Sequence, residues 1–145
     1  MNDKLILVVE DNPDHLELTV LTLEEHGADA EIVVARDGAQ ALEFLFGQGS
    51  HAGRDIHRQP NFMLLDMKLP KLSGLDVLRS VRANPQTALV PVIMLTSSSE
   101  ESDMVACYRA GANSFVRKPV DFGEFTGKLD TLQAYWLGVN EAVPA

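Results

Sequence analysis

The chain contains five short apolar runs, and a longer stretch with helical or turn character follows each one. The runs span residues 5–9, 30–35, 62–66, 92–96 and 114–117. Short apolar runs bounded by charged or turn residues are typical of parallel strands that are buried on both faces. Strand and helix therefore alternate five times, which predicts an α/β protein whose parallel sheet is covered on both faces.

Capping signals mark where the predicted helices begin. Asn12 and Pro13 suit the N-cap and the first helical position, sequences like a capping box begin at Asp37 and Ser73, and Asp121 precedes the last helix. Three serines followed by two glutamates, residues 97–101, cap the fourth helix. The predicted ends of the helices are Gly27, Gly47, Asn84, Gly111 and about Leu137, and residues 140–145 are expected to form a disordered tail.

Polar residues stand at the carboxyl ends of the predicted strands. Glu10 and Asp11 follow the first strand, Asp66 ends the third, Thr96 ends the fourth, and Lys118 follows the fifth. The strand order 2-1-3-4-5 of known doubly wound folds places the first and third strands side by side. In that order the three carboxylates meet in one crevice.

These five side chains together indicate phosphoryl transfer. Three carboxylates in one crevice repel each other unless a cation neutralises them, and hard oxygen ligands suit Mg²⁺, with Mn²⁺ as an alternative. A carboxylate nucleophile at Asp66 could attack phosphorus in line, while the Lys118 ammonium and the Thr96 hydroxyl stabilise charge on the phosphoryl oxygens. Taken singly, each residue could equally be a helix cap or a solvated side chain.

The composition excludes several classes of protein. A chain of 145 residues with 46% hydrophobic residues is expected to form one globular domain, residues 1–145. Its net charge of −9 argues against binding nucleic acid through a basic surface. No apolar stretch is long enough to span a membrane and no signal peptide is visible, so we expect no membrane partner and a cytoplasmic protein.

Two further features of the sequence have an ordinary interpretation. Cys107 is the only cysteine, which leaves no intrachain disulfide, and it is expected to pack as a small hydrophobe. His51 and His57 lie in a stretch, residues 47–60, that has no cysteine or carboxylate cluster at metal-ligand spacing. We therefore expect an exposed loop there.

The combined motif resembles the receiver domain of two-component response regulators. It consists of the acidic pair, Asp66, Pro70, Gly74, Thr96 and Lys118-Pro119. The resemblance covers about residues 4–132 and implies the flavodoxin-like receiver fold. It also implies a cytoplasmic signalling protein that catalyses only its own phosphotransfer and dephosphorylation, accepts its phosphoryl group from a sensor histidine kinase and acts through protein–protein contacts.

The resemblance also assigns roles around the carboxylates. Asp66 would accept the phosphoryl group as an acyl phosphate. Asp11, Asp66 and the backbone carbonyl of Lys68 would bind Mg²⁺, and Glu10 would act mainly through water. Lys118 would pair with the phosphate.

A switch is implied as well. Thr96 would hydrogen-bond to the phosphate, and Phe115 stands where the family carries an aromatic side chain that rotates on activation. Pro119 would follow a cis peptide bond. The long loop before the third strand, the serine-rich start of the fourth helix and the lack of a visible output domain most resemble the small response regulators paired with bacterial phytochromes.

Other interpretations remain open at this point. A phosphatase of the haloacid dehalogenase type needs a second aspartate two positions after the first, where this chain has Lys68. A flavodoxin-like electron carrier needs a phosphate-binding loop after the first strand, where this chain has acidic residues. A degenerate receiver that acts only as a binding module is a third alternative.

The last predicted helix carries an apolar stripe. It comprises Phe122, Phe125, Leu129, Leu132 and Trp136. The first four are expected to contact the sheet. Beyond them, in an extension of about residues 133–140, Tyr135, Trp136 and Val139 lack obvious cover, which predicts a homodimer.

Overall fold

The computed structural model describes residues 4–25 and 30–144. It contains a five-stranded parallel sheet in the order β2-β1-β3-β4-β5, as predicted. The strands are β1 (Lys4–Val9), β2 (Ala30–Ala35), β3 (Phe62–Asp66), β4 (Val92–Thr96) and β5 (Ser114–Arg117). Only the start of β1 differs from the prediction, by one residue.

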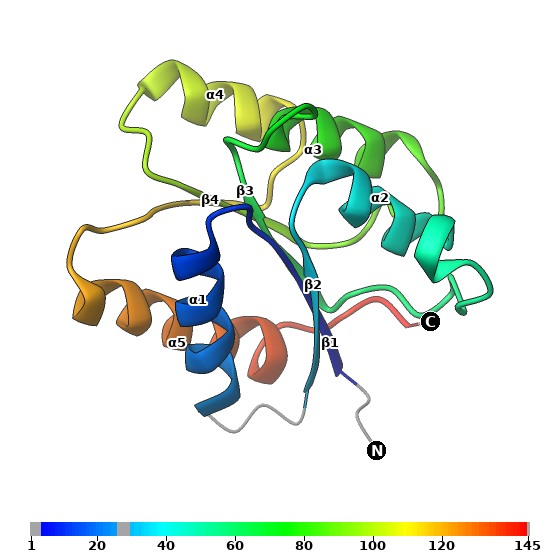
Figure 1. Ribbon diagram of the computed structural model, residues 1–145, viewed down its shortest axis with the longest axis horizontal. Helices are drawn as coiled ribbons and strands as arrows, with labels where there is room; N and C mark the ends of the chain where they lie inside the picture. The colour runs from blue at the N-terminus through cyan, green and yellow to red at the C-terminus, as the bar shows by residue number, and fades with distance from the viewer. Residues whose placement is uncertain (1–3, 26–29, 145) are drawn as a thin grey trace.

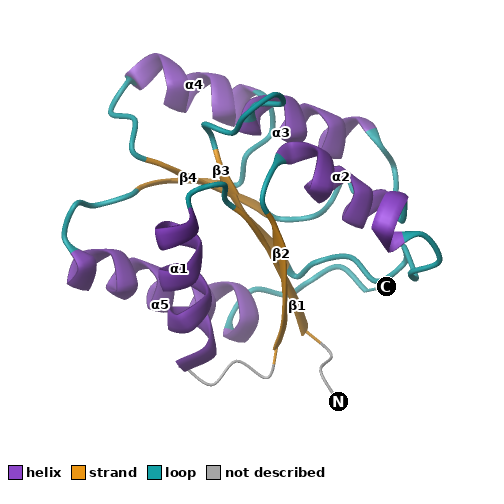
Figure 2. Cartoon of the chain, viewed as in Figure 1, coloured by secondary structure: helices purple, strands orange, loops and turns teal. Residues whose placement is uncertain are grey.

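Helices cover both faces of the sheet, with α1 and α5 on one side and α2, α3 and α4 on the other (Figures 1 and 2). The helices are α1 (Pro13–Glu25), α2 (Gly38–Phe46), the 3₁₀ turn η1 (Gly49–His51), α3 (Gly74–Ala83), α4 (Glu101–Arg109) and α5 (Phe122–Gly138). The end predicted at Gly27 lies outside the described residues. No helix in the described part of the chain is long and apolar enough to cross a membrane.

Alternate residues of each central strand enter two separate cores. In β1, Leu7 packs with α2 and α3 residues, whereas Ile6 packs with residues of α1 and α5. Every residue of β3 and β4 is buried, which explains why these strands read as unbroken apolar runs. Cys107 is fully buried in the first core, as expected, and burial raises the pKa of its thiol.

Most predicted caps are confirmed. The Asn12 Oδ1 atom accepts the backbone N–H groups of Asp14 and His15, and the carboxylate or hydroxyl oxygens of Asp37, Ser73 and Asp121 each accept the N–H three residues ahead. Helix α4 differs, because its N-cap is Glu100, whose side chain makes no capping hydrogen bond. Three consecutive serines could not by themselves show which residue starts that helix.

Residues 47–60 are more ordered than a solvated loop. The guanidinium carbon of Arg54 lies 3.9 Å from the centroid of the Phe44 ring, and His51 packs edge-on against the same ring. Arg54 also donates to the carbonyl oxygens of Phe44, Asp55 and Arg58. The buried Phe44 ring therefore holds the loop against α2. No local sequence pattern predicts this contact.

The C-terminal helix corrects two expectations. Phe122 is 71% exposed and does not contact the sheet, because it is the first residue of α5 and the helix meets the core only from Phe125 onward. Trp136 was expected to lack cover, but it is half-buried and packs against the α1–α5 core. Tyr135 and Val139 are 47% and 67% exposed, as expected.

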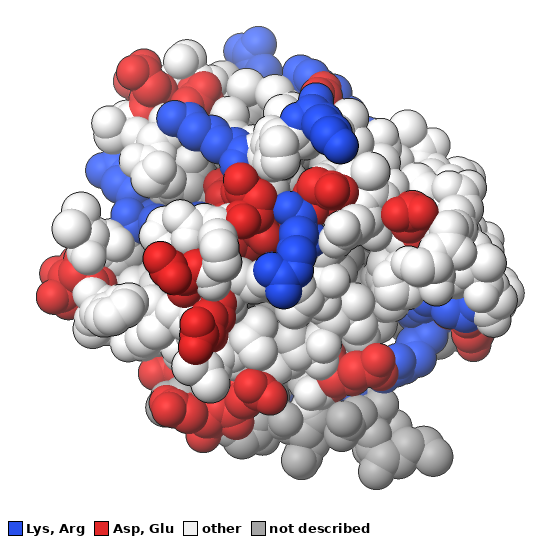
Figure 3. Space-filling model, in the orientation of Figure 1, with Lys and Arg blue, Asp and Glu red and all other residues white. Residues whose placement is uncertain are grey.

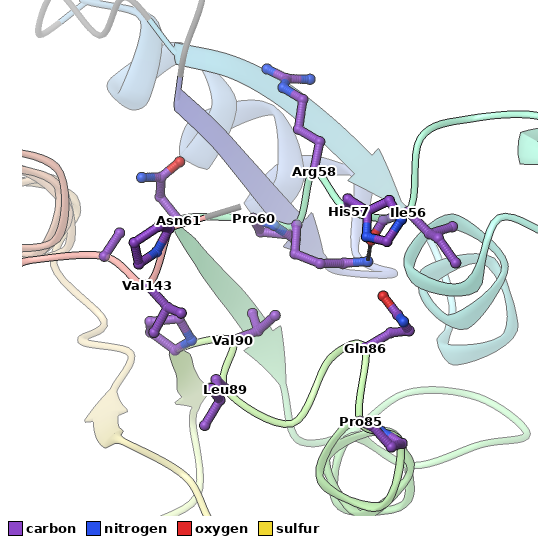
Figure 4. Close-up of a pocket in the computed structure, with 14 residues that line it drawn as sticks. Ile56, His57, Arg58, Pro60, Asn61, Pro85, Gln86, Leu89, Val90 and Val143 are labelled. Carbon is purple, nitrogen blue, oxygen red and sulfur yellow. Dashed lines mark hydrogen bonds between the residues drawn. The ribbon is translucent and has the colours of Figure 1, made fainter.

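Beyond α5, residues 141–144 form no helix or strand and are exposed, residue 145 lies outside the described residues, and the disorder expected for residues 140–145 stays a prediction. Ala142, Val143 and Pro144 line a cavity of about 350 Å³ together with the segments before β3 and β4 (Figure 4). Prolines and Val90 from those segments offer the tail apolar surface. This cavity lies at the amino-terminal edge of the sheet, away from the carboxylates.

The peptide bond before Pro119 is trans rather than cis. The cis form was implied only by the resemblance. The trans form is the lower-energy isomer of an X–Pro bond by about 0.5–1 kcal/mol, and in this form the Lys118 N–H donates to the Thr96 carbonyl oxygen at 2.7 Å.

Candidate functional site

The register of the sheet brings the predicted site residues together. Val9 of β1 pairs with Leu65 of β3, so Glu10 and Asp66 are the next residues on adjacent strands. On the other side of β3, Thr96 of β4 pairs with the last residue of β5, which places Lys118 one residue beyond. The site therefore follows from strand order and register.

Lys118 joins the carboxylates into one buried cluster. Its Nζ atom donates to Glu10 Oε1 and, at 3.2 Å, to Asp66 Oδ2. The side chains of Lys118, Glu10 and Asp66 are only 8%, 6% and 11% exposed. One ammonium thus faces two carboxylates in a poorly solvated place, where charge interactions are strong.

The pKa of Glu10 reflects this buried arrangement of charges. Burial, reinforced by the neighbouring Asp66 carboxyl group and only partly opposed by the Lys118 ammonium, raises the pKa of Glu10 to about 7. In the absence of metal, Glu10 therefore resists ionisation up to about neutral pH. A buried carboxyl group that resists ionisation beside a second one marks a place where a cation would bind favourably.

This shift predicts a pH-dependent stability for the metal-free protein. Between about pH 4.5 and 7 the folded chain keeps a proton on Glu10 that the unfolded chain has released, so the free energy of unfolding should fall as the pH rises through that window, by about 1–3 kcal/mol. Urea titrations in a chelating buffer at several pH values measure it. The Glu10→Gln variant should lose this part of the slope, and an unchanged slope would contradict the assignment.

Three carboxylates are placed to hold a cation. One oxygen each from Glu10, Asp11 and Asp66 lies within 4.8 Å of the other two, and this is the only such group of His, Cys, Asp and Glu side chains in residues 4–25 and 30–144. Acidic side chains also gather over α1 on the face shown in Figure 3. An all-oxygen donor set of three carboxylates fits Mg²⁺ or Mn²⁺.

The predicted fourth ligand is the backbone carbonyl of Lys68. Lys68 lies two positions after Asp66, and the backbone N–H of Lys68 donates to Asp66 Oδ1 at 3.2 Å. This contact turns the chain sharply around the carboxylate. The role of the Lys68 carbonyl oxygen as a metal ligand stays a prediction.

Thr96 connects the site to helix α4. Its buried Oγ1 atom accepts the N–H of Ser98 at 3.0 Å, while the Ser98 hydroxyl donates to Asp103 at 2.6 Å and accepts the N–H of Glu100. Phe115, one strand away, is half-buried against the core and lines a hollow beside α5. The two predicted switch residues are thus placed at the site and at the surface next to it.

Two further residues support the site from outside the carboxylate cluster. A Cβ atom on Gly74 would lie 2.1 Å from the Asp66 carbonyl oxygen, so only glycine allows α3 to begin against the β3 turn. His15, in the first turn of α1, lies with Nδ1 3.5 Å from Lys118 Nζ. The sequence analysis named Gly74 as part of the receiver motif without giving its steric role, whereas only its position in the structure identifies His15.

Residues 6–130 match the family model of the response regulator receiver domain. The chain belongs to the response regulator receiver family. Rcp1 of Synechocystis sp. is 33% identical to it over 134 residues, which cover 92% of this chain and 89% of Rcp1. The comparisons favour neither the phosphatase nor the electron carrier, and the receiver fold predicted from the sequence is confirmed.

Solved receivers give the same picture. The Mn²⁺-bound form of Rcp1 has a TM-score of 0.89 at 32% identity and covers 98% of this chain and 99% of its own. The phosphorylated cyanobacterial phytochrome response regulator RcpA has a TM-score of 0.89 at 28% identity, with coverages of 96% and 97%. The bacteriophytochrome response regulator AtBRR is 46% identical, with a TM-score of 0.72 and coverages of 97% and 96%. This receiver therefore resembles phytochrome-associated regulators over nearly its whole length.

Proposed function

We propose that this receiver is phosphorylated on Asp66 by a sensor histidine kinase with Mg²⁺, and that it passes the signal on by protein–protein contact. The observation that carries the proposal is the cluster of Lys118 with Glu10 and Asp66 at the ends of three strands. A complete set of functional groups also argues against a degenerate receiver. RcpA supports the proposal, because that relative has been solved in a phosphorylated form.

Each residue of the site has a step to perform. Asp66 Oδ attacks phosphorus as the bond from phosphorus to the donor's imidazole nitrogen breaks, so the carboxylate becomes an acyl phosphate. Lys118 already touches Asp66 Oδ2 and can follow the charge onto a phosphoryl oxygen. Thr96 Oγ1 can donate its proton to another oxygen while releasing its contact with Ser98.

Asp11, Asp66 and Glu10 would hold the divalent cation, with the Lys68 carbonyl as a further ligand. When bound, the cation supplies positive charge that stabilises the phosphoryl oxygens during transfer. Rcp1 supports this assignment, since it has been solved with Mn²⁺. Because Glu10 holds a proton near pH 7, binding of the cation should tighten as the pH rises.

The proposed kinase is a bacteriophytochrome or a related sensor. AtBRR, which is 46% identical, is a bacteriophytochrome response regulator. A cytoplasmic location follows from the proposed donor, because histidine kinases draw their phosphate from cytoplasmic ATP. As an enzyme the receiver would catalyse only the gain and loss of its own phosphate.

Metal binding and phosphorylation can be tested together. Incubation with acetyl phosphate and Mg²⁺ should add one phosphoryl mass increment, and a chelator should abolish it. Calorimetry should show about tenfold weaker Mg²⁺ binding by Asp11→Asn, because the variant lacks one hard, charged ligand. The Asp55→Asn variant, changed in the remote loop, is the control, and equal affinity of all three proteins would refute the ligand assignment.

We also propose a homodimer formed through α5. Tyr135 and Val139 are exposed, and the Tyr135 ring packs edge-on against Trp136 at a centroid distance of 5.0 Å, so the three side chains offer one apolar surface. Sedimentation equilibrium should show wild-type dimers that dissociate in the Tyr135→Ser/Val139→Ser variant. Val105→Ser, on α4 and therefore on the opposite face of the sheet (Figure 1), should not change the mass, and a monomeric wild type would refute the dimer.

A further inference from the structure

His15 stands at the open side of the site without an assigned role. It is the third residue of α1, and its side chain is 46% exposed. Its Nδ1 atom lies 3.5 Å from Lys118 Nζ and 3.8 Å from Glu10 Oε1. The imidazole therefore contacts the same ammonium that contacts the two carboxylates.

The chemistry of the two groups fixes the direction of this contact. An ammonium has three N–H donors and no acceptor. Lys118 directs them toward Glu10, Asp66 and His15, which belong to the end of β1, the end of β3 and the start of α1. The contact is a hydrogen bond when His15 Nδ1 is the acceptor, which is the tautomer that carries the imidazole N–H at Nε2.

A third acceptor matters because a lysine side chain is long and flexible. Two carboxylates attract the ammonium, and both come from the ends of neighbouring strands. His15 reaches Lys118 from a different element, the first turn of α1. Three acceptors on separate elements limit the ammonium to one position beside Asp66.

We propose that His15 is a positioning residue that holds the Lys118 ammonium beside the phosphoacceptor carboxylate. The inference deepens the proposed function and rests on it for its kinetic consequence. When Asp66 attacks phosphorus, its negative charge is lost to the new bond and Lys118 must shift toward a phosphoryl oxygen. His15 keeps Nζ within reach throughout this change.

The fold does not need the His15 side chain. The start of α1 is stabilised by Asn12, which accepts the backbone N–H of His15 and not a hydrogen from its ring. The carbonyl of His15 accepts from the Thr19 hydroxyl, again through backbone. Variants of the His15 side chain should therefore fold, so a change in their phosphorylation rate would not result from misfolding.

The kinetic test compares two substitutions in two backgrounds. His15→Phe keeps a ring but removes the acceptor, whereas His15→Asn keeps a side-chain acceptor. With acetyl phosphate and Mg²⁺, His15→Phe should form the acyl phosphate about threefold to tenfold more slowly, as expected for one lost charge-assisted hydrogen bond at a half-exposed site. His15→Asn should stay within about twofold of wild type.

The Lys118→Met background distinguishes positioning from any other role. There, His15→Phe should have no further effect, because the group that His15 positions is gone. His57→Phe, in the remote loop, should leave the rate unchanged in the wild-type background. Equal rates for wild type and His15→Phe, or the same loss with and without Lys118, would overturn the proposal.

A second measurement does not depend on phosphorylation. In metal-free protein, nitrogen-15 NMR should show the Lys118 ammonium hydrogens exchanging with water about threefold to tenfold faster in His15→Phe than in wild type or His15→Asn. Equal exchange in all three proteins would overturn the role of His15 whatever the acyl phosphate assay gives. A wild type that exchanges slowly but never gains phosphate would contradict the proposed function and leave the positioning of Lys118 intact.

Discussion

Replacing Gly74 with alanine should both destabilise the protein and slow its phosphorylation. The added Cβ would lie 2.1 Å from the Asp66 carbonyl oxygen and 2.8 Å from Met67 Cα, so backbone must move. Overpacking of this kind costs about 2–3 kcal/mol of unfolding free energy. Because the displaced backbone carries the phosphoacceptor, the rate with acetyl phosphate should fall at least about tenfold.

Gly127 provides the matched control for this substitution. It also lies in a helix, α5, but a Cβ there would meet nothing within 4 Å. Gly127→Ala should therefore stabilise the protein by about 0.5–1 kcal/mol through helix propensity. Urea titration and the phosphorylation rate should be measured on both variants, and a Gly74→Ala protein that matches wild type in both would contradict this account of the turn.

Replacing Arg82 with methionine should cause the largest loss of stability, about 3–4 kcal/mol. The guanidinium of Arg82 donates to the carbonyl oxygens of Gly111, Ala88 and Val90 at 2.7–3.0 Å and to the side chain of Asn113 at 2.8 Å. Methionine keeps the aliphatic part of the side chain but leaves these acceptors without their donor. Burial also lowers the pKa of Arg82, which is consistent with its enclosed position.

Arg79 on the same helix serves as the control for Arg82. Its side chain is 61% exposed and makes only a 3.7 Å ion pair with Asp76. Arg79→Met should change the free energy of unfolding by less than about 0.5 kcal/mol. Similar urea midpoints for Arg82→Met and Arg79→Met would show that the carbonyl contacts of Arg82 contribute little.

The strands were predictable because burial on both faces leaves a continuous apolar run. Each of β2 to β5 begins and ends where its run does, and the polar residues at or just after the ends of β1, β3, β4 and β5 lie in the site. Gly47 ends α2 in the left-handed conformation that its position suggested. The local sequence is enough to predict an element when a single residue type satisfies a local need, such as glycine at a left-handed helix end.

Contacts between distant segments could not be predicted in this way. Arg54 packs on Phe44 and Arg82 binds carbonyls up to 29 residues away, and neither arginine has a sequence signal. Phe122 continued a helical apolar stripe, yet it is exposed because α5 begins before it reaches the core. Periodicity gives the face of a helix but not where along its length that face is covered.

The same distinction applies to the site. The carboxylates, Thr96 and Lys118 stood at strand ends, so topology was enough to gather them. His15 touches Lys118 from a helix more than 100 residues away in the chain, and Ser98 links Thr96 to Asp103 only through the geometry of a turn. These supporting contacts require the three-dimensional structure.

The central claim is that Asp66 accepts the phosphoryl group, and the most direct test identifies the modified residue. Protein treated with acetyl phosphate and Mg²⁺ is reduced with borohydride, which converts an aspartyl phosphate to homoserine, and its peptides are analysed by mass spectrometry. The account predicts homoserine at position 66 alone, and none in Asp66→Asn. Homoserine at Asp11 or at any other aspartate, or a labile phosphate that persists in Asp66→Asn, would contradict it.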